Sequence, residues 1–150
     1  MVGEFVTVCR GWQTEFSMEA LQRYLLQKEN GIVLLNGYSG CGKTQILKGL
    51  KQLATRPVYL FSYRDVVDEI IKTRENCYRF LLELDVEGCV IGVEDVDYLD
   101  GKSATQKHLA DMIRIAADKH LIILTGNDVQ IRTPFLHEFC EPNIFVANAI

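Results

Sequence analysis

Apolar residues in this chain gather in short runs that alternate with segments of helical periodicity. Four runs are too short for typical helices and predict buried strands, at 32–35, 58–61, 89–93 and 121–124. A fifth strand is predicted at 144–147. Because the runs are apolar on both faces and are separated by helical segments, they predict a parallel sheet with crossover helices.

The spacing of apolar residues predicts one helix before the first strand and another after it. Ser17 is a candidate N-cap for the first helix, in which Leu21 and Leu25 share one face. Gly31 follows at the expected end of this helix. The second helix should begin directly after the glycine-rich segment that follows the first strand.

Two capping-box patterns mark the starts of further helices. Ser62 with Asp65 predicts one start, and Ser103 with Gln106 predicts another. The helix that Ser103 opens is expected to end near Lys119, where a basic side chain suits the helix dipole. A further helical stretch is predicted around 78–82.

Length, composition and charge fit one globular α/β domain. The 150 residues, 48% hydrophobic and 24% charged, predict a single three-layer domain over 1–150 with five parallel strands. A net charge of -4 provides no general attraction to nucleic acid. No apolar stretch approaches the ~20 residues of a membrane helix, so we expect a cytoplasmic protein without a membrane partner. Five scattered cysteines predict reduced thiols.

A glycine-rich segment between a predicted strand and a predicted helix matches a phosphate-binding loop. Residues 37–44 fit the pattern G-x-x-x-x-G-K-[ST]. Glycines let several backbone N–H groups approach one phosphate, and the following helix adds the positive end of its dipole. Lys43 should contact the β- and γ-phosphates, and Thr44 a magnesium ion. A flexible turn is the alternative, but the context favours nucleotide binding. The residues expected to bind the nucleotide are Gly37, Ser39, Gly40, Cys41, Gly42, Lys43, Thr44 and Gln45.

Two acidic residues, Glu94 and Asp95, directly follow the third predicted strand. They should emerge at the carboxyl edge of the sheet, beside the phosphate loop. We expect Thr44, Glu94 and Asp95 to form a magnesium site, with Asp95 also polarising the water that attacks the γ-phosphate. An ordinary acidic turn is the alternative, and the nearby Lys43 makes the metal site the favoured interpretation.

Asn127 follows the fourth predicted strand within a short polar turn. It is a candidate to hold the attacking water or to contact the γ-phosphate, which makes it a second catalytic candidate beside Asp95. The residue types of this turn also build ordinary loops, so the signal is weaker than that of the glycine-rich loop.

Three of these segments, in order, resemble the AAA+ ATPase domain of the DnaA and Hda family of bacterial replication initiators. Residues 37–44 are similar to its Walker A loop, 93–99 to its Walker B segment, and 124–127 to its sensor 1 turn. The resemblance implies a P-loop NTPase fold of the AAA+/ASCE type, in which the five predicted strands take the order 5-1-4-3-2. It implies ATP or ADP with Mg²⁺ as ligands.

The chain departs from the family pattern at three points. Glu94 stands where the family usually carries an aspartate, and Arg132 is the only arginine of the segment that would supply an arginine finger. After the last predicted strand we expect neither a helical lid nor a DNA-binding domain. With these departures, the resemblance implies an accessory or regulator of DNA replication initiation that acts through a protein partner. The negative net charge, and predicted helices that serve the sheet as crossovers, indicate that the chain does not bind specific DNA directly. A fragment of a larger initiator-like protein is the alternative.

Three activities remain open from the residues. The first is a slow ATPase, and the second is a nucleotide-binding module that does not hydrolyse ATP. The third is a small P-loop kinase, for which Arg64, Arg74 and Arg79 are the available arginines.

Overall fold

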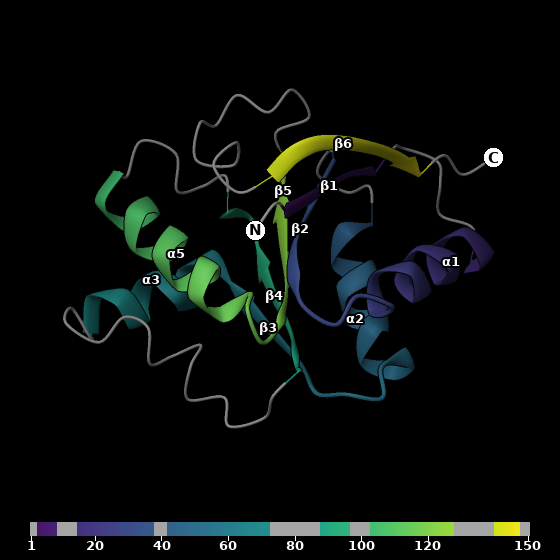
Figure 1. The fold of residues 1–150 in the computed structure, drawn as a ribbon, viewed down its shortest axis with the longest axis horizontal. Helices are drawn as coiled ribbons and strands as arrows, with labels where there is room; N and C mark the ends of the chain where they lie inside the picture. The colour runs from purple at the N-terminus through teal and green to yellow at the C-terminus, as the bar shows by residue number, and fades with distance from the viewer. Residues whose placement is uncertain are drawn as a thin grey trace.

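Parallel strands form the centre of the computed structural model, which describes residues 3–8, 15–37, 42–72, 88–96, 103–127 and 140–147. The strands are β1 (Gly3–Val8), β2 (Gly31–Asn36), β3 (Val58–Ser62), β4 (Val90–Glu94), β5 (Leu121–Gly126) and β6 (Cys140–Ala147). They form one six-stranded sheet in the order β3-β4-β5-β2-β1-β6, and every neighbouring pair is parallel (Figure 1).

The predicted order is confirmed for four strands, and an additional strand separates the fifth, β6, from the first, β2. Strands β2, β5, β4 and β3 follow the expected order 1-4-3-2, but β1 lies between β2 and β6. The sheet therefore has one strand more than the five predicted. Glu4 and Thr7 interrupt the apolar run of β1, which hides it from the hydropathy pattern. Phe5, Val6 and Val8 are nevertheless residue types that favour strands.

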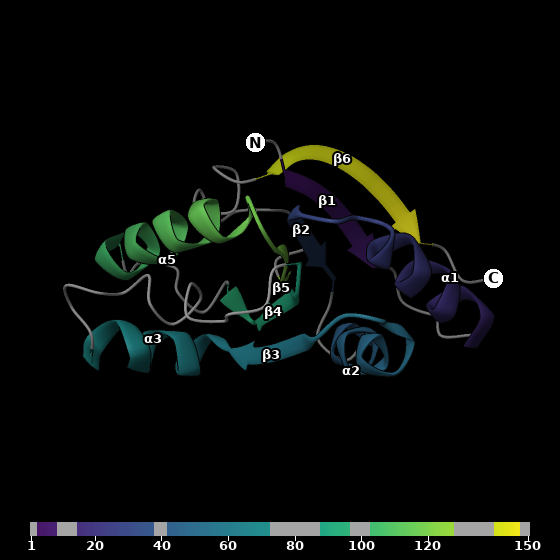
Figure 2. The same ribbon diagram turned by 60° about the horizontal axis from the view of Figure 1, so that its bottom comes forward.

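Helices cover both faces of the sheet, which confirms the predicted three layers. Helices α1 (Glu15–Leu26) and α2 (Lys43–Leu53) lie on one face, whereas α3 (Tyr63–Lys72) and α5 (Ser103–Ala116) lie on the other (Figures 1 and 2). The helical stretch predicted around 78–82 lies outside the described residues.

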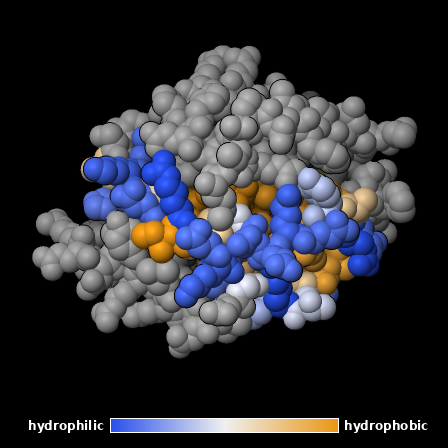
Figure 3. Space-filling model, in the orientation of Figure 1, coloured by the Kyte–Doolittle hydropathy of each residue, from blue (hydrophilic) through white to orange (hydrophobic). Residues whose placement is uncertain are grey.

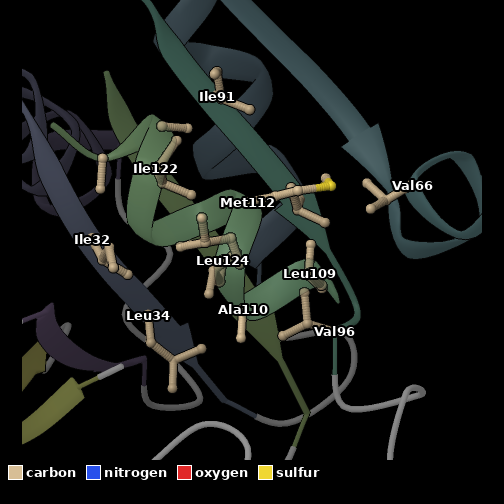
Figure 4. Close-up of a cluster of buried hydrophobic side chains, with 14 of the residues drawn as sticks. Ile32, Leu34, Val66, Ile91, Val96, Leu109, Ala110, Met112, Ile122 and Leu124 are labelled. Atoms are coloured by element: carbon tan, nitrogen blue, oxygen red, sulfur yellow. The ribbon is translucent and has the colours of Figure 1, made fainter. Parts of the chain in front are cut away.

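A buried hydrophobic cluster joins the sheet to α3 and α5 (Figure 4). It includes Val66 of α3, Leu109 and Met112 of α5, Ile91 of β4 and Ile122 of β5. Each large aliphatic side chain buried in this way stabilises the fold by roughly 1.5–3 kcal/mol relative to exposure. This cluster fixes the two strands whose carboxyl ends carry Glu94, Asp95 and Asn127.

A second cluster packs α1 and α2 against the opposite face of the sheet. It contains Leu21 and Leu25 of α1, as predicted, together with Ile46 and Leu50 of α2. Gln22 is also buried between these helices, and its Nε2 donates a hydrogen bond to the Ile46 carbonyl oxygen at 3.1 Å. The position of α2, and with it the position of Lys43 and Thr44 at its start, therefore depends on α1.

The predicted start of α3 is confirmed atom by atom. The Ser62 N–H donates to Asp65 Oδ2 at 2.9 Å, and the Asp65 N–H donates to Ser62 Oγ at 3.2 Å. By contrast, α1 begins at Glu15, so the prediction that Ser17 caps it is wrong. The predicted start is two residues late because it rests on the apolar positions Leu21 and Leu25, and the helix begins well before them.

Helix α5 ends at Ala116, three residues before the predicted end at Lys119. The chain continues in a tighter turn, in which the Lys119 N–H donates to the Ala116 carbonyl oxygen at 3.1 Å. Such i to i+3 hydrogen bonds are common where a helix ends. The turn then leads directly into β5.

A single guanidinium group joins three loops at the amino edge of the sheet. Arg56 Nη1 donates to the carbonyl oxygens of Glu29 at 2.8 Å and Gly88 at 3.3 Å. Its Nη2 donates to those of Leu26 at 3.4 Å and Lys28. Burial lowers the pKa of Arg56.

Cys89 and His120 form a buried pair at the same edge, with Sγ 3.0 Å from Nδ1. Burial raises the pKa of the Cys89 thiol, so it stays protonated at neutral pH. For Cys89, the prediction of a reduced thiol is confirmed.

The surface shown in Figure 3 is mostly hydrophilic where the chain is described, with hydrophobic side chains visible between the polar ones. Among the described helices, none combines the length and the hydrophobicity needed to span a bilayer.

Candidate functional site

Three parallel strands end together at the carboxyl edge of the sheet. In the pairing of β2 with β5, Asn36 lies beside Gly126, and in the pairing of β4 with β5, Val93 lies beside Leu124. The residues that follow these strands therefore meet at one edge. This edge carries Gly37, Lys43, Thr44, Glu94, Asp95 and Asn127, all candidates from the sequence.

The phosphate loop begins and ends as the motif requires. The Gly37 N–H donates to the Gly126 carbonyl oxygen at 3.2 Å, which extends the β2–β5 pairing to the first residue of the loop. At the other end, Gly42 is the N-cap of α2 with a φ of 105°, a conformation that favours glycine. Ser39, Gly40 and Cys41 lie outside the described residues.

The first turn of α2 is suited to an anion. Gly42 has no side chain that could cap the helix, and the first turn contains no acidic residue. Lys43, at 6% exposure, directs its Nζ to the Gly37 carbonyl oxygen at 2.5 Å. A buried cation beside the N-terminus of a helix, where the helix dipole is positive, is an arrangement that binds phosphate. Gln45 is exposed on the same turn.

Thr44 and Glu94 are in direct contact, although 50 residues separate them in sequence. The Thr44 hydroxyl donates to Glu94 Oε1 at 2.7 Å. Glu94 faces α2 because it alternates with Val90, whose side chain belongs to the cluster under that helix. The longer glutamate side chain thus reaches the residue expected to hold magnesium.

Asp95 takes a separate position from its neighbour Glu94. Its φ is 60°, a left-handed conformation that is uncommon for residues other than glycine. Asn127 Nδ2 donates to Asp95 Oδ1 at 3.1 Å. The Asp95 N–H donates to Thr125 Oγ1 at 3.0 Å. The structure therefore brings together the two residues predicted to be catalytic, Asp95 and Asn127.

Sequence reasoning missed two residues at this edge, Asn36 and Thr125. Both are buried, at 0% and 1% exposure. In the part of the chain that the structure describes, neither Oδ1 nor Nδ2 of Asn36 has a hydrogen-bond partner, whereas Thr125 Oγ1 accepts from the Asp95 N–H. Each is the first polar residue after an apolar run that forms a buried strand. That position is the signal that could have identified them.

The donor set suits magnesium better than a transition metal. Among the described residues, no three side chains of the types His, Cys, Asp and Glu gather at one point. Magnesium commonly takes one or two carboxylates and fills its other positions with water and phosphate oxygens. The Thr44 hydroxyl with the Glu94 carboxylate fits this requirement.

The fold and this edge together define a P-loop ATPase-type domain. The family model described as "ATPase family associated with various cellular activities (AAA)" matches residues 33–147, and the chain belongs to this family. No curated protein matches the chain by sequence.

Solved structures with the same fold include replication proteins. Domain III of the Thermotoga maritima replication initiation protein DnaA is similar with a TM-score of 0.60 and 16% identity, over 75% of this chain and 50% of that one. A DNA replication initiation factor has a TM-score of 0.57 and 18% identity, over 86% and 43%. C. elegans PCH-2 has a TM-score of 0.58 and 19% identity, over 92% and 44%. This chain thus spans half or less of the length of each.

Proposed function

We propose that the chain binds ATP or ADP with Mg²⁺ at the carboxyl edge of β2, β4 and β5. The observation that carries this proposal is the convergence of Lys43, Thr44 and Glu94 at the start of α2. Lys43 would exchange its contact with the Gly37 carbonyl for the β- and γ-phosphates. Thr44 and Glu94 would hold the magnesium ion, directly or through water.

Binding can be tested by thermal unfolding with and without Mg²⁺-ATP. A ligand that binds only the folded protein at a hundredfold excess over its dissociation constant stabilises it by about 2.7 kcal/mol, which for this chain length is roughly 5–10 °C. Lys43→Ala should remove the shift. Lys48→Ala is the matched control, because Lys48 is exposed on the same helix. Equal shifts in both variants, or none in the wild type, would reject the proposal.

Hydrolysis, where it occurs, would use the second carboxylate. Asp95 would polarise the attacking water and Asn127 would orient it, since their side chains are already joined. An arginine finger contributes roughly a thousandfold or more in other P-loop enzymes. We expect slow turnover, because Arg132 is the only arginine of the segment that would supply such a finger here. Arg64, the described candidate from the kinase alternative, instead donates from Nε to Tyr63 Oη at 3.1 Å.

Phosphate release from purified protein separates the ATPase from the non-hydrolysing module. Asp95→Asn should lower turnover and leave ATP affinity nearly unchanged. Binding without any turnover would favour the module. A rate of many per second for the protein alone would contradict the slow ATPase.

The partner we propose is a protein of DNA replication initiation, for which this chain acts as an accessory or regulator. Support comes from the DnaA fold similarity and from the net charge of -4, which disfavours direct contact with DNA phosphates. Fluorescence anisotropy with duplex DNA near physiological salt should show no specific binding. Replication proteins should co-purify with the wild type in ATP, and not with Lys43→Ala.

A further inference from the structure

Thr125 lies beneath the turn that carries the second carboxylate. It lies near the end of β5, two residues before Asn127. Its side chain faces α2, because it lies on the same face of the strand as Leu121 and Ile123, which belong to the cluster under that helix. At 1% exposure it belongs to the interior, yet its hydroxyl oxygen accepts from the Asp95 N–H at 3.0 Å.

This contact replaces the backbone pairing that ends just before it. The register of β4 with β5 stops at Val93 and Leu124. Beyond that point Asp95 turns to a φ of 60° and its N–H points to the Thr125 side chain. Non-glycine residues in this conformation persist only when their surroundings hold them there.

We propose that Thr125 is a positioning residue that fixes the backbone of Asp95, so that Asn127 meets the Asp95 carboxylate in one geometry. Asp95 is then held at two points. Its backbone N–H donates to Thr125, at the end of β5, and its side-chain Oδ1 accepts from Asn127, just beyond that strand. The expected effect of Thr125 on ATP turnover rests on the proposed function. The expected effect of Thr125 on the backbone conformation at Asp95 is independent of ATP binding.

Thr125→Val removes the hydroxyl and keeps the shape of the side chain, while Thr125→Ser keeps the hydroxyl. By NMR, the Asp95 amide should exchange its hydrogen about fivefold faster or more in the valine variant, and close to the wild-type rate in the serine variant. In ATP turnover, kcat should fall about tenfold to a hundredfold in the valine variant with KM nearly unchanged, and the serine variant should recover most of it.

Thr55→Val is the control for the chemical change, since Thr55 is exposed in the turn before β3. It should alter neither measurement. Unchanged exchange at Asp95 in Thr125→Val would overturn the proposal, as would equal loss of turnover in the valine and serine variants or none in the valine variant. If the wild type does not bind ATP, the proposed function fails, and if it binds ATP without turnover, the non-hydrolysing module is favoured. In both cases amide exchange still decides whether Thr125 holds the turn.

Discussion

Replacing Gly49 with alanine should destabilise the protein, although alanine is the better helix former. Gly49 lies in the middle of α2, where alanine alone would gain about 0.5–1 kcal/mol. A Cβ at this position would lie 2.1 Å from Gln22 Nε2, so the Gln22 side chain must move. Moving it breaks the buried hydrogen bond to the Ile46 carbonyl oxygen.

The larger of these two effects decides the sign. Leaving buried polar groups without partners costs about 1–3 kcal/mol, which exceeds the gain in helix propensity. We therefore expect Gly49→Ala to lower the free energy of unfolding by about 1–2 kcal/mol. Urea unfolding would show this as a lower midpoint with an unchanged slope.

A double-mutant cycle supplies the control. Gln22→Ala removes the side chain that the new Cβ would displace, so adding Gly49→Ala to it should be neutral or stabilising. A Gly49→Ala variant as stable as the wild type, with no coupling to Gln22→Ala, would show that the α1–α2 contact is not as close as described.

Three further predictions concern polar groups that are buried or partly buried. Arg56→Ala should lower the free energy of unfolding by about 2–3 kcal/mol, because several carbonyl oxygens lose their donor. The stability of Arg56→Lys should lie between those of the wild type and Arg56→Ala. An unchanged urea midpoint in Arg56→Ala would contradict this prediction. Asn36→Val should raise the free energy of unfolding by about 1–2 kcal/mol, since it removes buried polar atoms that lack partners among the described residues. A lower melting temperature would contradict this and would indicate that a buried water binds the Asn36 side chain. Because burial raises the pKa of Cys89, the unfolded chain loses this proton first, so stability should decline above about pH 8.5. Under reducing conditions Cys89→Ala should show a weaker decline, and identical pH profiles would refute the assignment.

Local chemistry made much of the fold predictable. Ser62 and Asp65 satisfy each other's backbone N–H groups, so the start of α3 could be read from residue type and spacing alone. Strand β1 was hidden because its partners on both sides, β2 and β6, decide its structure more than its own pattern does. Its insertion separates the fifth predicted strand, β6, from the first, β2.

The candidate site was predictable in its membership and not in its geometry. Motif spacing placed Lys43, Thr44 and the two carboxylates at one edge. Glu94 turns toward Thr44 and Asp95 toward Asn127 because of the left-handed turn at Asp95. Aspartate adopts a positive φ more readily than most residues, but its presence alone does not predict one. The turn is held by the Thr125 side chain of β5, a contact between strands that the local sequence does not contain.

The central claim is that nucleotide and metal bind together at the carboxyl edge of the sheet. Replacing Mg²⁺ by paramagnetic Mn²⁺ in a complex with ATP, and recording amide NMR signals, tests both the binding and its place. We predict strong, ATP-dependent broadening at Thr44, Asp95 and Asn127, and little at Gly31 and Gly88 on the opposite edge. Broadening at the opposite edge, or none with ATP present, would contradict the account.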